Sequence, residues 1–177
     1  MRFFFFGLLS DPDVLELVID RAAQGQPFPA ARLHDRRLHR VENETFPMLV
    51  EAPGEIVPGV IVDGLTEADR ARIEFFESVE YEHRSIDVEL LSGPWIAARA
   101  FAATARAAPA AEPWTLEDWR LRHKAKDLRE ARIWMSLYGI LSLEEADRFW
   151  DSALENGRSP AEAVRELLAE PRRVRGS

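Results

Sequence analysis

The stretch MRFFFFGLLSDPDVL, residues 1–15, decides the fold of this chain. Residues 3–6 are four consecutive phenylalanines without polar alternation, which is typical of a strand buried on both faces. Asp11 and Pro12 then carry the signals of a helix start, as the N-cap and the first-turn residue. Residues 7–9 are therefore predicted to connect a buried strand tightly to a helix.

A secretory signal peptide would also begin with an apolar stretch. Such a signal has a basic segment followed by a longer apolar one, whereas here only Arg2 precedes the phenylalanines and Asp11 and Asp13 follow them. The chain has no cysteine, and its sequence shows no apolar run of 18 residues. These features favour a folded strand and a cytoplasmic location, and they exclude disulfides and thiolate metal sites.

The composition indicates one globular core. A chain of 177 residues, 46% of them hydrophobic, can bury one core with a small appendage. The net charge of −8 and the pI near 5.1 repel nucleic-acid phosphates and anionic membranes. Neither nucleic acid nor membrane is expected as the main partner.

The middle of the chain predicts a mixed α+β domain. Residues 29–65 contain short apolar pieces separated by proline and glycine, which favours an antiparallel or mixed sheet. Thr66 begins a capping box for a helix that reaches residue 79. Alternating apolar and acidic residues then predict a strand over 86–90, and a further strand is expected over 95–101.

Three parts are expected along the chain: a domain over 1–105, a linker over 106–113 and a helical extension over 114–177. The linker is predicted because this segment is rich in alanine and proline. The extension should pack on the domain, because it would be costly to leave its large apolar residues in water. These residues are Trp119, Leu128, Trp134, Phe149 and Trp150.

The extension should contain three helices. The first is expected from Thr115 to Tyr138, the second from Ser142 to Gly157 and the third from Ser159 to Pro171. Three roles remain open for them: they line a pocket, form the surface of a homodimer, or cover a face of the sheet.

Common catalytic signatures are absent. The sequence has no GxxxxGK[ST], GxGxxG, GxSxG or HExxH motif. His34, His39, His83 and His123 are scattered and lack the spacing of metal ligands, so no metal site is expected.

Glu77 is the carboxylate that stands out in the acidic middle of the chain. It follows Ile73 by four residues and Phe76 by one, so in a helix it borders the stripe that faces the core. A carboxylate held against apolar side chains is desolvated, its pKa rises, and it can accept a proton near neutral pH. The alternative is an ion pair with Arg72 or Arg84.

Three short motifs follow one another in the first 105 residues. They are Phe6-Gly7-Leu8-Leu9, then Phe46-Pro47 with Val57-Pro58-Gly59-Val60, and finally IEFFESVEYEHR at 73–84. In this order and spacing the chain resembles the gamma-glutamylcyclotransferase-like family. Members of that family typically show Tyr-Gly-Thr/Ser-Leu/Asn, Tyr/Phe-Pro with Val-x-Gly, and Leu-Asp-x-Phe-Glu-Gly-x-x-Tyr-x-Arg.

The resemblance implies a small mixed β-barrel with flanking helices and a pocket at one end. It also implies a γ-glutamyl substrate, which Glu77 as general base helps to cyclise to 5-oxoproline with release of an amine. The substrate-binding residues that it implies are Phe6, Gly7, Leu8, Leu9 and Tyr81. Because ring closure is intramolecular, positioning can carry much of the rate and no cofactor is expected.

The chain departs from the family pattern at three positions. Phe6 and Leu8 replace residues with hydroxyl groups, and Ser78 replaces the glycine after the glutamate. Two hypotheses follow. In the first the protein is an enzyme in which Glu77 faces an open pocket beside Gly7. In the second it is a non-catalytic binding or interaction module, in which Glu77 is paired with arginine or Phe6 and Leu8 fill the pocket.

Overall fold

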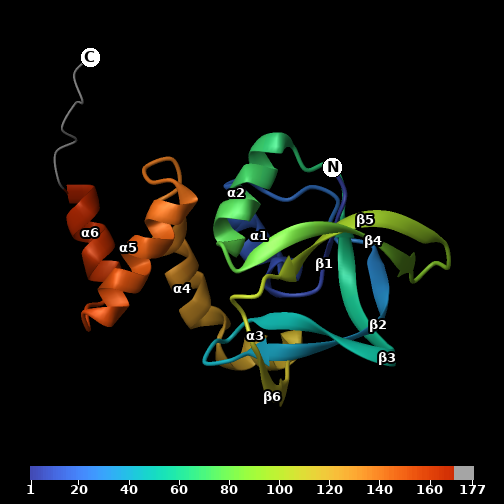
Figure 1. The fold of residues 1–177 in the computed structure, drawn as a ribbon. Coiled ribbons are helices and arrows are strands. Elements are labelled where there is room, and N and C mark those ends of the chain that lie inside the picture. Colours follow the sequence, from blue (N-terminus) through green and yellow to red (C-terminus); the bar gives the residue numbers. More distant parts are fainter. Residues whose placement is uncertain (170–177) are drawn as a thin grey trace.

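The computed structural model describes residues 1–169 (Figure 1). The elements, in chain order, are β1 (Phe3–Phe5), the short 3-10 helix η1 (Leu8–Ser10), α1 (Pro12–Ile19), β2 (Ala30–Val41), β3 (Pro47–Val62), α2 (Glu67–Glu77), β4 (Tyr81–Leu90), β5 (Trp95–Ala103), β6 (Pro109–Pro113), α3 (Leu116–Arg122), α4 (Lys124–Met135), α5 (Leu143–Glu155) and α6 (Pro160–Ala169). The chain is thus an α+β protein, as its sequence predicts.

Five of the strands close into a barrel. Strand β1 pairs antiparallel with β3 and parallel with β5, and the order continues through β4 to β2. Pairing of β2 with β3 along most of their length closes the ring. The expected small mixed barrel is confirmed, and closure leaves β1 without a free edge.

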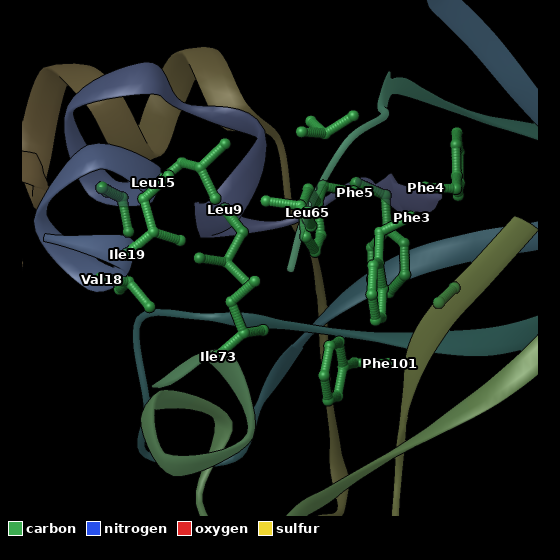
Figure 2. Packing of buried hydrophobic residues seen from close by; sticks show 14 of the residues in the cluster. Phe3, Phe4, Phe5, Leu9, Leu15, Val18, Ile19, Leu65, Ile73 and Phe101 are labelled. Carbon is green, nitrogen blue, oxygen red and sulfur yellow. The ribbon is translucent and has the colours of Figure 1, made fainter. Parts of the chain in front are cut away.

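The phenylalanines of the opening strand form the centre of the core. Phe3 and Phe4 are completely buried, and Phe5 and Phe6 nearly so. The ring of Phe3 stacks on Phe5 at 5.6 Å and on Phe101 of β5 at 5.7 Å. Figure 2 shows Phe3, Phe4, Phe5 and Phe101 and, beside them, apolar side chains of α1 and α2. Both faces of β1 are therefore covered, which explains the lack of polar alternation.

Gly59 of β3 leaves room for the ring of Phe4. A Cβ at this position would lie 2.5 Å from the ring of Phe4 and 2.5 Å from the carbonyl oxygen of Phe5. Glycine is required here for space, since the paired strand β1 places a ring and a carbonyl oxygen where a Cβ would stand.

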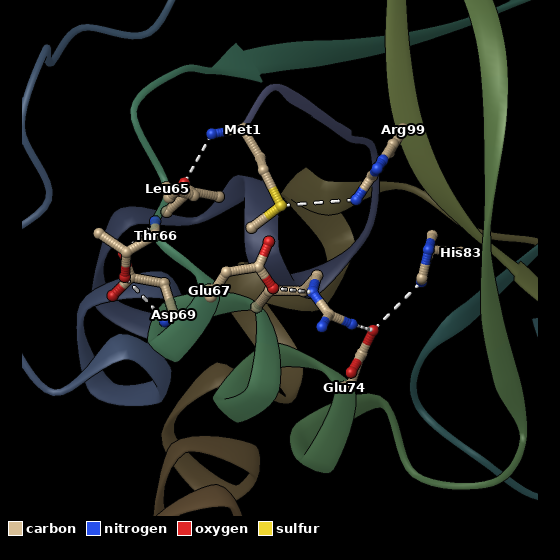
Figure 3. Close-up of polar contacts among 9 residues, drawn as sticks. Met1, Leu65, Thr66, Glu67, Asp69, Glu74, His83 and Arg99 are labelled. Carbon is tan, nitrogen blue, oxygen red and sulfur yellow. Dashed lines mark hydrogen bonds and ion pairs between the residues drawn. The ribbon is translucent and has the colours of Figure 1, made fainter.

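The first two helices begin at the predicted caps. The Asp11 side chain accepts a hydrogen bond from the N–H of Asp13 at the start of α1. Thr66 and Asp69 form the predicted capping box at the start of α2, drawn in Figure 3. Helix α1 ends at Ile19, because Asp20 adopts a left-handed conformation.

The segment 106–113 is not the linker that its composition suggests. Its second half is strand β6, which pairs antiparallel with β2, where Val41 faces Pro109 and His39 faces Pro113. Proline and alanine are tolerated because β6 is the outer strand and the missing N–H groups of the prolines leave its pairing intact. The C-terminal helices are thus joined to the barrel through a strand of the same sheet.

The first predicted C-terminal helix is divided in two. Helix α3 ends at Arg122, the backbone of the following His123 leaves the helical region, and α4 begins at Lys124. The break lets Trp119 of α3 point into the core, where only 1% of it is exposed. Leu128, Trp134, Phe149 and Trp150 pack against the same core. Helices α5 and α6 lie on the far side of α4 from the barrel (Figure 1).

The predicted end of the third helix at Pro171 lies outside the described residues. Within residues 1–169, no helix has both the length and the apolar character that crossing a bilayer requires.

Candidate active site

A cavity of about 310 Å³ lies where β1 ends, between the barrel and the C-terminal helices. This volume is at the lower end of the range for small-molecule sites. Its lining comes from the end of β1 and the loop after it, the segment before β3, the end of α2, and α4 and α5. The C-terminal helices therefore line the pocket, one of the three roles that the sequence left open.

Every residue that the sequence suggested for the site lies at this cavity. These residues are Phe6, Gly7, Leu8, Leu9, Glu77 and Tyr81. They come from three separate elements, which barrel closure brings together. Phe6 and Leu8 line the cavity without filling it, since the open volume remains beside them.

Glu77 is the last residue of α2 and carries an unpaired carboxylate. No hydrogen bond or ion pair to its side chain occurs within residues 1–169. The two arginines considered as partners are engaged elsewhere: Arg84 with Glu82, and Arg72 with the carbonyl oxygen of Val18. Burial without a compensating charge raises the pKa of Glu77 from its ordinary 4.5 to about 8.

Glu74 shows the contrast one helical turn earlier. Its carboxylate is bound by Arg70 on the same helix and lies 3.2 Å from the ring Nδ1 of His83 on β4 (Figure 3). Glu74 does not line the cavity. Of these two acids on α2, only Glu77 combines desolvation with access to the cavity.

Ser78 directs the chain away from α2 immediately after Glu77. Its backbone has φ 58° and ψ −166°, a conformation that L-residues rarely adopt and that costs about 1–3 kcal/mol. The family that the sequence resembles typically has glycine at this position. Glycine suits it because it adopts a positive φ without the steric penalty of a Cβ. This backbone strain is located next to Glu77, the carboxylate whose pKa is raised.

Gly7 packs against Pro47, Pro47 is hydrogen-bonded to Tyr81, and all three residues line the cavity. A Cβ on Gly7 would lie 3.1 Å from Cγ of Pro47. The carbonyl oxygen of Pro47 accepts a hydrogen bond from the Tyr81 hydroxyl at 3.0 Å. Burial raises the pKa of Tyr81, so its hydroxyl keeps the proton that this bond needs.

The loop after β1 presents free donors. Within the described chain, the N–H groups of Leu8 and Leu9 have no hydrogen-bond acceptor, whereas those of Ser10 and Asp11 are bonded to Gly7 and Leu8. These two N–H groups belong to residues that line the cavity. Two adjacent free N–H groups are suited to hold a carboxylate.

The amino end of α1 does not add to these donors. Asp11 occupies it as the N-cap, and its carboxylate also binds Arg120 and Lys124 at 2.7 and 2.8 Å. Burial raises the pKa of Asp11, but the hydrogen bonds and charges of Lys124 and Arg120 outweigh it and lower the pKa overall. Asp11 therefore joins α1 to the C-terminal helices.

Several residues that line the cavity were not predicted as site residues from the sequence. They are Glu44, Glu80, Asp127, Glu130, Trp134, Asp147, Trp150 and Asp151. Each has the pattern of an ordinary surface or packing residue, and no spacing links them in the sequence. Their convergence depends on how α4 and α5 pack against α2, where the Trp134 indole donates a hydrogen bond to the Phe75 carbonyl oxygen at 2.8 Å.

The arrangement suits proton transfer to and from a small molecule. A carboxylate with a pKa of about 8 can accept a proton from an ammonium group and return it within one cycle. Within residues 1–169, no group of three histidine or acidic side chains is arranged to hold a metal ion.

The fold and the cavity together define a closed barrel with a cavity at one end, lined by the desolvated carboxylate of Glu77. The sequence profile of the family described as gamma-glutamyl cyclotransferase, AIG2-like, matches residues 3–121. The chain belongs to this family.

Known proteins resemble the chain over most of its length. Protein AIG2 C of Arabidopsis thaliana is 23% identical over 168 residues, which span 94% of this chain and 92% of the relative. The solution structure of another Arabidopsis thaliana protein has a TM-score of 0.56 at 22% identity and covers 96% of this chain and 94% of its own. A solved structure described as a gamma-glutamyl cyclotransferase has a TM-score of 0.54 at 20% identity, with coverage of 99% and 91%. At this identity the structures share the fold.

Proposed function

We propose that this protein is an enzyme that cyclises the γ-glutamyl group of a small molecule to 5-oxoproline and releases an amine, with Glu77 as general base. One observation carries the proposal. The unpaired carboxylate of Glu77 lies in an open cavity beside the loop of residues 7–9, and desolvation raises its pKa to about 8. Membership of the gamma-glutamyl cyclotransferase, AIG2-like family supports it.

The reaction needs one proton acceptor and no further reactant. Glu77 takes a proton from the substrate's α-ammonium group, and the freed nitrogen attacks the γ-amide carbonyl carbon. A new C–N bond closes the five-membered ring and the C–N bond to the departing amine breaks. Glu77 returns its proton to the departing nitrogen, and the second proton that the ring nitrogen loses on forming the lactam also goes to that nitrogen, so the amine leaves as an ammonium group and the products together contain the atoms of the substrate.

The pKa of Glu77 matches that of the α-ammonium group from which it would take a proton. A reference α-ammonium group titrates near ~7.7 to 8.0, whereas an exposed glutamate titrates near ~4.3. A carboxylate with a pKa of about 8 exchanges a proton with that ammonium group at little cost. Desolvation of Glu77 is thus the property that the reaction uses.

The loop after β1 is assigned to the substrate's α-carboxylate. The N–H groups of Leu8 and Leu9 are the donors, and because they belong to the backbone, the missing hydroxyl groups at Phe6 and Leu8 do not remove them. Gly7 and Tyr81 hold this loop through Pro47. The rings of Phe6 and Tyr81 contact the carbon chain of the γ-glutamyl group.

The test is release of 5-oxoproline from a panel of γ-glutamyl compounds. We expect the native protein to release it with a rate that rises with pH through about 8, and Glu77→Gln to lower the rate by about 10² to 10⁴. Glu67→Gln is the matched control, because Glu67 is an exposed acid on the same helix that does not line the cavity. Full activity in Glu77→Gln would remove Glu77 from the mechanism, and inactivity of the native protein toward the whole panel would favour a binding module.

A further inference from the structure

The connection between β2 and β3, residues 42–46, is held at Thr45 by later parts of the chain. The Thr45 hydroxyl donates a hydrogen bond to Oδ2 of Asp127 on α4 at 2.6 Å. The carbonyl oxygen of Thr45 accepts a hydrogen bond from the Trp114 indole at 2.8 Å. Thr45 and Asp127 both line the cavity. Two atoms of one cavity residue are therefore fixed by side chains that follow it by 82 and 69 positions.

Asp127 is itself held in one orientation. Its Oδ2 also accepts a hydrogen bond from the Trp119 indole at 2.7 Å, and both residues are buried. Asp127 lies in the first turn of α4, where the positive end of the helix dipole stabilises a carboxylate. Hydrogen bonds to an ionised acceptor are roughly twice as strong as those between neutral groups. Trp119, Asp127 and Thr45 thus form one network, in which the carboxylate fixes the position of the threonine.

The second oxygen of the Asp127 carboxylate is unsatisfied. Within residues 1–169, Oδ1 is buried and has no hydrogen-bond partner. A buried charged oxygen without a donor lowers the stability of the folded protein. Local features that lower stability are expected at functional sites, where another role compensates for them. This cost indicates that Asp127 has a role besides stability.

The residues that follow Thr45 support the groups that the proposed function assigns to the γ-glutamyl half of the substrate. The ring of Phe46 meets the ring of Tyr81 edge to face, with the centroids 6.2 Å apart. Pro47 packs against Gly7, and its carbonyl oxygen accepts the hydrogen bond of the Tyr81 hydroxyl. A shift at Thr45 would therefore reach Pro47 two residues later, and through it the loop of residues 7–9 and Tyr81.

The C-terminal helices have a separate attachment to the barrel domain. Asp11 at the start of α1 binds Arg120 of α3 and Lys124 of α4. Loss of the hydrogen bond between Thr45 and Asp127 should therefore release residues 42–46 while the helices keep their place.

We propose that Asp127 is a positioning residue of the active site, which acts through Thr45 to fix residues 45–47 and thereby places Tyr81 and the loop of residues 7–9 against the γ-glutamyl group. The inference rests on the proposed function, because it concerns the same substrate. Asp127 acts through its hydrogen bond to Thr45 and not by contact with the γ-glutamyl group.

Thr45→Val and Thr45→Ser test this hydrogen bond. Valine keeps the branched shape and removes the hydroxyl, whereas serine keeps the hydroxyl. We expect kcat/KM for 5-oxoproline release to fall about tenfold in Thr45→Val and to stay within about threefold of the native value in Thr45→Ser. Native kcat/KM in Thr45→Val would overturn the inference. An equal loss in both variants would do the same, because the hydroxyl would then not be the group that matters.

Asp127→Asn distinguishes positioning from direct contact with the substrate. Asparagine keeps the shape and offers one uncharged oxygen to Trp119 and Thr45, so kcat/KM should fall about tenfold. In the Thr45→Val protein the same substitution should cost less than about threefold, since the bond that it weakens is already absent. Independent losses of about a hundredfold together would mean that each side chain contacts the substrate by itself, and would overturn the positioning role.

Arg120→Gln is the matched control for stability. It weakens the attachment of α3 to Asp11, and Arg120 does not line the cavity. It should lower the midpoint of urea unfolding about as much as Thr45→Val does, while kcat/KM stays within about twofold of the native value. A loss of kcat/KM equal to that in Thr45→Val would assign the effect to general loosening of the helices and overturn the role of Asp127.

Binding of 5-oxoproline, measured by calorimetry, separates this inference from the proposed function. 5-Oxoproline carries the carboxylate assigned to the loop of residues 7–9, so its affinity reports on positioning without turnover. Binding about tenfold weaker in Thr45→Val, in a protein whose native form releases no 5-oxoproline, would reject the cyclotransferase function and retain the positioning role. Release by the native protein, with equal affinity and equal kcat/KM in Thr45→Val, would do the reverse. A native protein that neither binds nor releases 5-oxoproline would reject both.

Discussion

The Tyr81 hydroxyl donates a hydrogen bond to the carbonyl oxygen of Pro47 at 3.0 Å, and the ring of Pro47 lies against Gly7. Removing that hydroxyl in Tyr81→Phe leaves a buried carbonyl oxygen without its donor. We expect a loss of about 1 kcal/mol in the free energy of unfolding, measured in urea. Because the loop of residues 7–9 rests on Pro47, kcat/KM for 5-oxoproline release should fall about tenfold or more.

The matched control is Ser136→Ala, which removes a hydroxyl that donates to the carbonyl oxygen of Ile133 and does not line this cavity. It should lower stability by a similar amount while retaining most of the activity. If Tyr81→Phe were as active as the native protein, the proposed activity would not depend on this hydrogen bond to Pro47.

The raised pKa of Glu77 makes the stability of the protein depend on pH. Between about pH 4.5 and 8 the unfolded chain loses the proton of Glu77 while the folded protein keeps it, so native stability falls as pH rises. Glu77→Gln removes this dependence. Relative to the native protein, the variant should gain stability across that window by up to roughly 1.4 kcal/mol per pH unit, and on the order of 5 kcal/mol in total.

Urea unfolding at pH 4, 6 and 9 measures this difference. The two proteins should be nearly equal in stability at pH 4, and the variant should be the more stable at pH 9. Parallel curves over the whole range would mean that the carboxylate is solvated in the folded protein.

Ser78→Gly should stabilise the protein. Glycine adopts φ 58° without the Cβ penalty that serine meets, and this gain exceeds the extra freedom that glycine gives the unfolded chain. We expect about 1 kcal/mol of added stability in urea unfolding. Ser85→Gly, at an exposed position in β4, provides the opposite control and should destabilise the protein by roughly 0.5–1 kcal/mol. Destabilisation by Ser78→Gly would show that the serine hydroxyl, which accepts the N–H of Glu80, outweighs the strain.

Asp11→Asn should destabilise the protein by about 2 kcal/mol, since asparagine can cap α1 but cannot neutralise Arg120 and Lys124. The pKa of Asp11 is lowered in the folded protein, so its contribution is present above the ordinary aspartate range and is lost as the pH falls through the lowered value. Native and variant proteins should therefore converge in stability at acidic pH. Asp13→Asn, at an exposed partner of Lys124, should cost less than about 0.5 kcal/mol. An equal loss of stability in Asp11→Asn and Asp13→Asn would show that burial does not strengthen the ion pairs of Asp11.

Local patterns in the sequence predicted the barrel's first strand, the caps of the first two helices and the position of Glu77. Each depends on residues close in the chain: the run at 3–6, the cap at Asp11, the box from Thr66 to Asp69, and the place of Glu77 on the apolar border of its helix. The buried face of a helix or strand is encoded in its own periodicity.

Long-range packing determined what the sequence could not show. Strand β6 looks like a linker because its composition is poor in β-forming residues, and its partner β2 lies some seventy positions earlier. The break at His123 follows from the need to bury Trp119. Glu80, Asp127 and Asp147 have no common spacing, so only the approach of α4 and α5 to the barrel brings them to one cavity.

The cavity is lined by two segments of the chain, one inside the span that the family profile matches and one after it. Glu77 and the loop of residues 7–9 lie within the matched span 3–121, whereas the cavity-lining parts of α4 and α5 follow it. Under the proposed function, mutations in the later segment can alter which departing group is accepted while Glu77 and the loop of residues 7–9 stay unchanged. Under the same proposal, directed evolution of a new substrate range would start with residues 124–155 and keep residues 7–9 and Glu77.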